Sequence, residues 1–393
     1  MTNSRIDYER KLALELARIE RRVEALFLVA AKEAAGISGL VHDLSPDKPF
    51  SFTDYPLTKS RVDKMLGELS TGLVSTIVKG IDVAWALSEG KNDELVKAIF
   101  GKRNVAKMND ESRRRYFADT SRARKAFHDR KISGLSLSDR VWRYVEQFKE
   151  EIELGLDCGI RDGVGAAEMA RELRKYLREP DRLFRRVRNK FGQLVLSKAA
   201  KAYHPGQGVY RSSYKNARRL AATETSIAYR TADHDRWGKM DFVVGIEVKL
   251  SNNHTLNGEP FVDICDDLAG KYPKDFKFVG WHPLCRCYVV SILKTQEEFL
   301  RDLDGVDRGS VNAVKDVPEG FKAWCIRNEE RIDGAEERGT LPYFIRDNRD
   351  FVDRALGRIV EPPVESQKPT ILERAAARHA ARTPEQIADI KAR

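Results

Sequence analysis

A segment between residues 254 and 287 gathers most of the side chains that could bind a transition metal. Proteins bind zinc through thiolates and imidazoles that converge on the ion at about 2.0–2.3 Å, usually four in number. An H-x-x-C-x-C run with a more distant Cys or His could supply such a set, and a metal would stabilise a segment that lacks its own hydrophobic core. The candidate ligands are His254, Cys265, His282, Cys285 and Cys287.

The spacing leaves three interpretations of this segment open. It is not a pair of C-x-x-C motifs, and a C-x-C run places both sulfurs on one ion only with strain. A structural metal site, a hydrogen-bonded or partly disulfide-linked turn, and a catalytic metal site all fit. The catalytic version is a metal-dependent nuclease that uses His254, Asp263 and His282. Alternatively, Asp263, Asp266 and Asp267 could cap backbone amides.

Two runs of strand length bracket this segment. FVVGIEVKL at 242–250 and CYVVSILK at 287–294 are rich in β-branched residues, and the chain between them is rich in His, Asp, Gly and Pro. The alanine-rich stretch 211–237 before them predicts a helix. The sequence therefore predicts two strands that frame one irregular loop.

Glu224 on that helix is flanked by Thr223 and Thr225, a combination that also occurs in active sites. Arg218, Arg219 and Arg230 are near it in sequence, so an ion-pair or packing role is the simpler interpretation. No Ser-His-Asp order, P-loop or Gly-rich nucleotide motif is legible. We therefore expect neither an enzyme nor a small-molecule substrate.

Helical periodicity dominates the rest of the chain. Apolar residues recur at spacings of three and four in 6–34, 57–87, 133–157 and 166–177, with an end expected near Gly90 and breaks expected at Gly155 to Gly165. The predicted class is α+β and predominantly helical: an N-terminal helical region precedes a helical domain with a small β-sheet and a Cys/His-rich loop. The predicted divisions are 1–132, 133–295, a C-terminal extension 296–359, and a linker with a basic terminal helix at 360–393.

The charge balance favours polyanionic partners mildly. Lys and Arg number 70 against 60 Asp and Glu, which gives a formal net charge of +10. One basic stretch runs from 113 to 131, and the densest cluster lies on a helix expected after Asp181. Solvated surface charge and phosphate contact are both open interpretations. The nucleic-acid-binding candidates are Arg182, Arg185, Arg186, Arg188 and Lys190.

Cysteine usage and hydropathy indicate where the protein works. The chain has five cysteines, an odd number in a long chain, which argues against a secreted disulfide framework and for a reducing compartment. The N-terminal segment carries charges throughout and lacks the apolar core of a secretory signal. No stretch approaches about 20 uninterrupted apolar residues, so we expect no membrane contact.

From about Leu135 to Leu293 the chain resembles the Mu F-like head-morphogenesis domain of tailed phages. The resemblance is carried by SDRVW, ARELR, RRLAATET, DICDDLAGKYP and, most specifically, WHPLCRC. Two departures stand out. Many relatives have Cys three positions before Cys265, where this chain has Val262, and His254 could take the place of the missing ligand. The Arg that precedes T-E-T in the family is Ala222 here.

The resemblance implies a minor capsid or minor head protein that contacts portal and capsid or scaffold proteins and packaged double-stranded DNA. It implies a location inside the virion head, and in the host cytoplasm during assembly. Such domains are sometimes fused to toxins, so a toxin or effector activity in 296–393 is an alternative. The run GTLPYFIRDN at 339–348 is distinctive there, and a buried aromatic turn is its simplest interpretation.

Overall fold

The computed structural model describes residues 2–38, 40–41, 50–161, 163–179, 187–188, 190–195, 210, 212–251, 255–256, 259–260, 262–302 and 308–358. It is a predominantly helical α+β structure, which confirms the predicted class. The predicted linker and terminal helix at 360–393 lie outside the described residues. No helix in the described part of the chain is both long and apolar enough to cross a bilayer.

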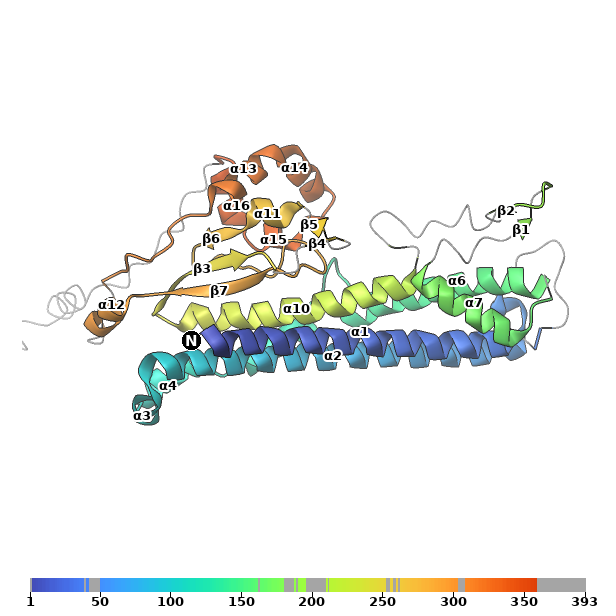
Figure 1. Ribbon diagram of the computed structural model, residues 1–393, viewed down its shortest axis with the longest axis horizontal. Helices are drawn as coiled ribbons and strands as arrows, with labels where there is room; N and C mark the ends of the chain where they lie inside the picture. Colours follow the sequence, from blue (N-terminus) through green and yellow to red (C-terminus); the bar gives the residue numbers. More distant parts are fainter. Residues whose placement is uncertain are drawn as a thin grey trace, which may run out of the picture.

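Three long helices lie side by side and form most of an elongated body (Figure 1). They are α1 (Thr2–Ser38), α2 (Pro56–Phe100) and α10 (Ser213–Lys239), each of which contains a stretch predicted to be helical. At about 1.5 Å per residue, the 45 residues of α2 span roughly 68 Å. Their predicted apolar stripes are buried against one another; in α1, for example, Ile19 and Val23 are buried.

The predicted end of α2 near Gly90 is wrong. A Cβ atom at Gly90 would lie 3.0 Å from the Tyr8 hydroxyl, so this glycine lets α1 approach and does not interrupt the helix. The helix continues to Phe100 and ends at Gly101, which has a φ of +78°. Left-handed backbone of this kind suits glycine at a helix end.

At the far end of the body α6 (Leu137–Arg161) and α7 (Ala166–Arg178) complete the bundle. The predicted break at Gly155 and Gly159 is wrong, because α6 continues through both. A Cβ at Gly159 would meet the Met169 sulfur at 2.7 Å, so this residue is small to admit α7. The chain turns only at Gly163, which has a φ of +69°. We call α1, α2, α6, α7 and α10 the rod.

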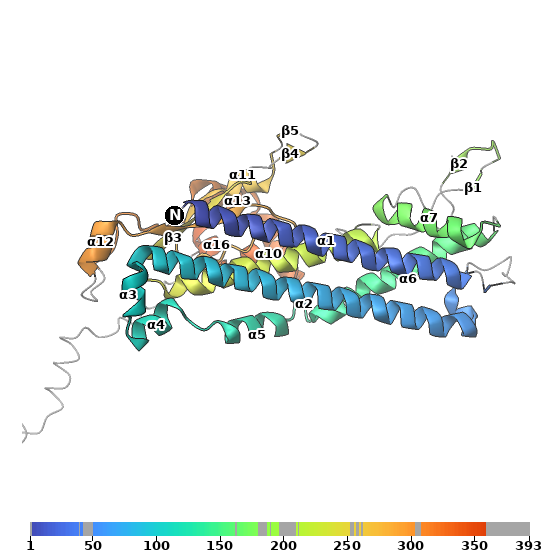
Figure 2. The same cartoon turned by 60° about the horizontal axis from the view of Figure 1, so that its bottom comes forward.

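The basic stretch 113–131 does not form one helix. It is divided between α4 (Asp110–Tyr116) and α5 (Ser121–Asp129), which follow α3 (Lys102–Ala106) at the end of α2 (Figure 2). The interruption is held by tertiary contacts: the Trp85 indole donates to Thr120 Oγ1 at 2.9 Å, and the Tyr116 hydroxyl donates to Asp241. Local periodicity could not reveal these partners.

The helix predicted over 182–190 is also wrong where the structure describes it. Val187–Arg188 form strand β1, which pairs antiparallel with β2 (Leu194–Val195). Gly192, with a φ of +73°, lies in the turn between them. The β-branched and leucine residues on both sides of this turn favour a hairpin over a helix.

A second body, the lobe, lies against one end of the rod (Figure 1). Its sheet has the antiparallel order β6-β3-β7, with β3 (Val243–Lys249) and β7 (Tyr288–Leu293) at the predicted places. The edge strand β6 (Gly270–Tyr272) was not predicted, because three residues show no alternation. The segment between the two predicted strands is therefore not wholly irregular; it also holds α11 (Ile264–Leu268) and the hairpin of β4 (Thr255–Leu256) with β5 (Glu259–Pro260).

The chain after the sheet returns to cover it. Helices α13 (Glu319–Arg327), α14 (Glu329–Glu337), α15 (Tyr343–Arg346) and α16 (Arg349–Ala355) pack on the lobe, while α12 (Gln296–Arg301) lies beyond it. They share one aromatic core with the sheet, in which Tyr272, Phe276 and Phe321 are fully buried. Phe344 and Ile345 are buried as well, so the buried aromatic turn expected at 339–348 is confirmed.

Candidate metal centre

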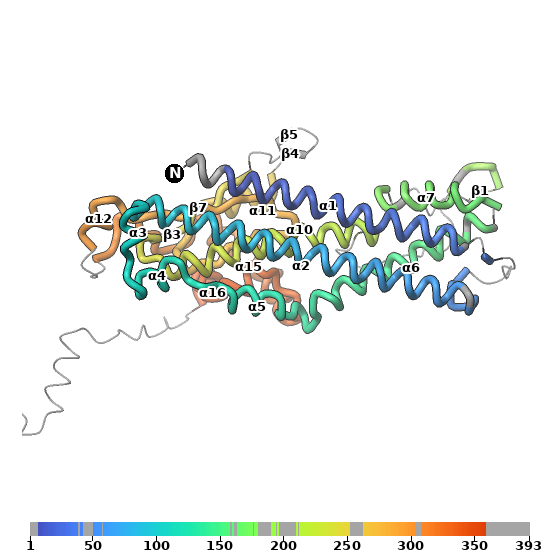
Figure 3. Tube along the Cα trace, turned by 90° about the horizontal axis from the view of Figure 1, so that it is seen from below, coloured from blue at the N-terminus to red at the C-terminus, as the bar shows by residue number. Residues whose placement is uncertain are grey.

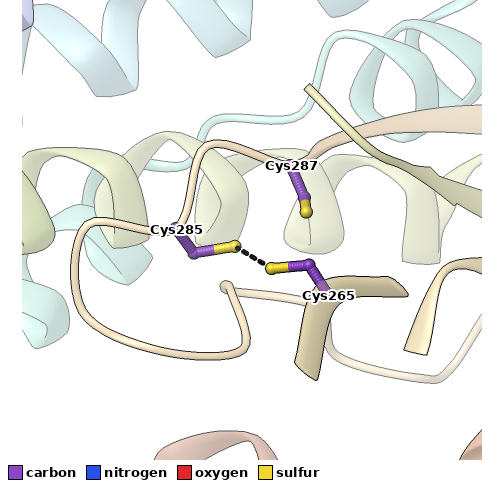
Figure 4. A group of neighbouring side chains, drawn as sticks. All are labelled: Cys265, Cys285 and Cys287. Carbon is purple, nitrogen blue, oxygen red and sulfur yellow. Dashed lines mark hydrogen bonds between the residues drawn. The ribbon is translucent and has the colours of Figure 1, made fainter. Parts of the chain in front are cut away.

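Three buried thiols converge within the lobe (Figure 4). Cys265 lies on α11, whereas Cys285 and Cys287 lie on the loop that leads into β7. The three sulfurs all lie within 4.8 Å of one another, and the Cys265 and Cys285 sulfurs are 3.9 Å apart. All three cysteines are free. Cys265 and Cys285 are 20 positions apart in the sequence, so it is the tertiary fold that brings them together.

His282 adds an imidazole to the same cluster. Its Nε2 lies 3.2 Å from the Cys265 sulfur and 3.6 Å from Asp263 Oδ2. Its Nδ1 lies 2.8 Å from the Pro283 carbonyl oxygen, which can only accept, so Nδ1 carries the proton in this pair. In the neutral ring Nε2 then presents its lone pair toward Cys265, the arrangement that metal-binding histidines use.

Arg230 of α10 holds the backbone of this loop in place. Its guanidinium, which is buried, donates to the carbonyls of Val279 at 3.0 Å, Cys285 at 2.8 Å and Cys287 at 2.7 Å. Charged hydrogen bonds to buried carbonyls are among the stronger ones in proteins. Arg230 therefore fixes the loop on the rod and leaves the thiols free to point at one another.

The loop itself needs two unusual backbone conformations. Leu284 has a φ of +63° and its amide donates to Thr223 Oγ1 of α10 at 3.2 Å. Gly280 has a φ of +115°, and a Cβ there would lie 2.6 Å from Arg230 Nη1. Gly280 must therefore be glycine, both for its conformation and for the close approach of Arg230.

The acidic residues beside Cys265 set the start of α11. Asp263 is its N-cap and accepts from the Cys265 amide at 2.7 Å, while the Asp266 carboxylate accepts from the Asp263 amide at 2.8 Å. The capping role predicted for these two residues is confirmed. Asp267 pairs instead with Arg327 at 2.9 Å. The cap orients α11 so that Cys265 faces the loop.

Two separations at Cys265 are close to those of a tetrahedral metal site. Two sulfurs bound at about 2.3 Å to one zinc ion lie roughly 3.8 Å apart, and a sulfur and an imidazole nitrogen about 3.5 Å apart. The observed 3.9 Å between Cys265 and Cys285 and 3.2 Å between Cys265 and His282 are close to these edges. Hydrogen bonds among the three thiols lower the pKa of Cys285 and raise the pKa of Cys265, so Cys285 is the thiol that most readily forms the thiolate that binds metal.

The predicted metal ligands are brought together in large part. Cys265 belongs to two groups that could each hold a metal: the thiols of Cys265, Cys285 and Cys287, and the group of Asp263, Cys265 and His282. His254 lies outside the described residues. The sequence missed Arg230, although its place four residues after Ser226 and eight after Ala222, on the side of α10 that is buried, was a usable signal.

The structure describes only two of the five predicted nucleic-acid-binding residues. Arg182, Arg185 and Arg186 lie outside the described residues, and Arg188 is described only as part of β1. Lys190 is exposed, and its ammonium lies 5.0 Å from the centre of the Phe191 ring. Nucleic-acid contact at these five positions therefore stays a prediction.

Glu224 has the ion-pair role predicted for it, with different partners. It is buried and pairs with Arg130, at the end of α5, and with Arg140 of α6, the latter at 2.8 Å. None of the three arginines near it in sequence is the partner, since helix α10 turns them elsewhere. Glu224 therefore joins α5 and α6 to α10.

Comparison of the chain with protein-family models, with curated proteins and with solved structures gave no match. The sequence motifs and the geometry of the site are therefore the observations that bear on function.

Proposed function

We propose that this protein is a minor structural protein of a tailed-phage head, associated with the portal and with packaged DNA. The observation that supports this best is the convergence of the two motifs that carry the resemblance. DICDD supplies Cys265, which lies in one group with Cys285 and Cys287 of WHPLCRC and in a second group with His282 of the same motif. The parts of the sequence that resemble the Mu F-like domain thus cooperate in a single structural element.

The burial of that cluster favours a structural over a catalytic role. Cys265, Cys285 and Cys287 are exposed by only 2%, 4% and 3%. A catalytic metal keeps one coordination position open to substrate, whereas a structural one is closed by protein ligands. Two of the three residues that a nuclease would use also have structural partners: Asp263 caps α11, and His282 is bound to the Pro283 carbonyl.

We propose that the ion is a single zinc, held by Cys265, Cys285, Cys287 and His282. Bound there, zinc would supply a cross-link between α11 and the loop before β7, and no reaction chemistry. Arg230 would hold the loop carbonyls and Asp263 the start of α11, so that the ligands are oriented from both sides.

The rod suits a docking role. It is a bundle roughly 68 Å long whose apolar stripes are used within the chain and whose surface is charged. A long, rigid element of this kind can present the lobe at a distance from its attachment point. Its partners in the proposal are the portal and the capsid or scaffold proteins.

Elemental analysis of the purified protein tests the metal. We expect one zinc per chain, reduced to a small fraction of that in Cys285→Ser. The matched control is Cys325→Ala, which removes a buried thiol from α13, outside the cluster, and should keep its zinc. Wild-type protein that binds no metal when purified and refolded with zinc would contradict this part of the proposal.

Mass spectrometry of purified virions and co-purification with the portal protein test the head role. We expect the chain in mature heads, in few copies relative to the major capsid protein. Its absence from virions, together with failure to co-purify with the portal from infected or induced cells, would contradict the role whatever the metal result.

A further inference from the structure

A second site lies on the outer side of the metal-ligand loop. A groove of about 1230 Å³ runs between the loop 130–133, which joins α5 to α6, and the helices α14 and α15. Its floor is formed by α10 and by Trp281, His282 and Pro283. It exceeds the roughly 300–1,000 Å³ typical of small-molecule sites, so it suits part of a polymer.

The charges in this groove are almost all of one sign. Among its described lining residues there is one carboxylate, Asp347, against six side-chain cations. The carboxylate already pairs with two of the cations. The cations are Arg130, Lys131, Lys277, Arg331, Arg338 and Arg346.

Three of these cations are left for a ligand. In the described part of the chain no carboxylate forms an ion pair with Lys131, Arg331 or Arg338, and all three are exposed. The contact of Arg331 is with the neutral Asn328 side chain, at 3.0 Å. Charges of one sign on the walls of a cleft concentrate their field within it and attract polyanions.

Helix α14 shows that the positive charge of the groove comes from the orientation of the helix and not from its amino-acid composition. The helix carries five acidic residues, yet the positions that line the groove are Arg331, Ile332 and Ala335, followed by Arg338. Acidic side chains on its other faces are taken by partners. Glu329 and Asp333 pair with Arg358, and Glu336 pairs with Arg349.

Aromatic residues lie among the cations. Trp324 and Tyr343, both half-buried, line the same groove as Arg338 and Arg346. Grooves that bind nucleic-acid strands combine cations along the backbone with aromatic faces on which bases stack. An acidic peptide would use the cations alone, so the aromatics favour a nucleic acid.

We propose that this basic groove binds the phosphodiester backbone of a nucleic-acid strand. Lys131 on one wall and Arg331 and Arg338 on the other contact phosphates. The inference deepens the DNA contact contained in the proposed function and rests on it to that extent. It assigns that contact to the boundary between rod and lobe, where Arg130 and Lys131, at the end of the basic stretch 113–131, line the groove.

Fluorescence anisotropy with the full chain tests the groove. The probes are a labelled 20-nucleotide single strand and the matching duplex, each measured at 50 and 200 mM salt. The variant is Arg331→Glu/Arg338→Glu. The control is Arg114→Glu/Arg122→Glu, which changes the net charge equally on α4 and α5, outside the groove.

We expect the groove variant to weaken binding about tenfold or more and to reduce the salt dependence by roughly two phosphate contacts, while the control changes little. Tighter binding of the single strand would place a strand inside the groove; equal or tighter binding of the duplex would place its backbone across the mouth. Circular dichroism must show that both variants are folded, and Arg331→Lys/Arg338→Lys should restore most of the affinity.

Three outcomes would overturn the inference: equal losses in the groove and control variants, displacement of the probe by poly-glutamate at the same charge concentration, or no binding to either probe. None of these would remove the chain from the virion. The groove can therefore fail while the head role stands, and a chain absent from heads could still bind DNA through the groove.

Discussion

The rod and the lobe are built on different physical principles (Figure 3). The rod is held by long apolar stripes on helices of 37, 45 and 27 residues, with a few buried polar networks between them. The lobe has a three-stranded sheet whose edge strand is three residues long, and it depends on an aromatic core and the thiol cluster. The elements of the rod are long helices with a repeated local pattern of apolar residues. The elements of the lobe are short and are held by contacts between residues far apart in the sequence.

This difference predicts separate vulnerabilities. Packing along a pair of long helices distributes stability over many turns, so the loss of one contact removes only a small part of it. A small sheet covered by short helices depends on the few contacts that fix its loops, here Arg230 and the cysteines. Conditions that remove these contacts should loosen the lobe and leave the rod intact, whereas damage to the polar network of the rod should destabilise the bundle.

The largest effect expected is loss of the lobe when the metal is removed. A structural zinc contributes about 10–16 kcal/mol in zinc-finger peptides, comparable to the whole stability of a domain. We expect a strong chelator to increase amide exchange at 264–293 by on the order of 100-fold or more, while residues 60–100 of α2 keep their protection. Hydrogen-exchange mass spectrometry measures both regions in one sample. If the chelator increased exchange equally in both regions, or in neither, the claim that the lobe depends on the metal and the rod does not would be contradicted.

A smaller effect is expected from Asp233→Ala in the rod. Asp233 is fully buried on α10 and accepts from Ser88 at 2.7 Å and Asn92 at 2.9 Å; it also pairs with Lys91, which is itself buried. Removing it leaves the ammonium without this carboxylate, which costs about 3–5 kcal/mol in comparable cases. Urea unfolding followed by circular dichroism gives the free energy of unfolding.

The control for this change is Asp235→Ala, two residues further on α10. Asp235 pairs with Lys239 one turn away near the surface, at 2.9 Å, and such pairs contribute about 0.3–0.5 kcal/mol. A loss of similar size in the two variants would show that the buried network has no special weight in the rod.

The smallest effect is a pH dependence in the segment beyond the sheet. Hydrogen bonds from Ser310 Oγ and from the amides of Val311 and Thr295 lower the pKa of Glu298 from 4.5 to about 2. The folded state therefore favours the carboxylate, and this stabilisation is complete above pH 4.5. It is lost as the pH falls from about 4.5 to about 2.

Thermal unfolding of wild type and Glu298→Gln checks this. The difference between their melting temperatures should be larger at pH 6 than at pH 3, because at pH 3 Glu298 of the unfolded chain binds a proton that the folded state, with its lowered pKa, largely excludes. A difference that does not change over this range would mean that Glu298 does not act through its charge.

Much of the rod could be predicted from sequence because its signal is local. The heptad-like stripe that contains Ile19 and Val23 predicted α1, and alanine-rich periodicity predicted α10. The failures came where glycine has a packing role. Gly90 and Gly159 were interpreted as breaks, yet each lies under a side chain from another helix, which no local pattern reveals.

Residue type was enough to predict the ligands of the candidate site. It was not enough to predict the residues that hold the ligand loop in place. Thiols and an imidazole are rare enough that Cys265, His282 and Cys285 could be singled out before their positions were known. Arg230 and Thr223 are ordinary residues on a helix; its spacing on α10 could mark Arg230 as buried, but nothing local marks either residue as a group that fixes the loop. The groove cations were likewise scattered among 70 basic residues.

The sequence by itself determined the long helices, two of the three strands in the lobe sheet and the chemical identity of the metal-ligand candidates, because periodicity and residue type act over a few neighbours. Only the tertiary structure decided that Cys265 meets Cys285, that Arg230 holds their loop, and that α14 turns Arg331 and Arg338 toward Lys131. These pairings join residues from 20 to about 200 positions apart. They depend on how the lobe packs against the rod, a property of the whole chain that no short window of sequence contains.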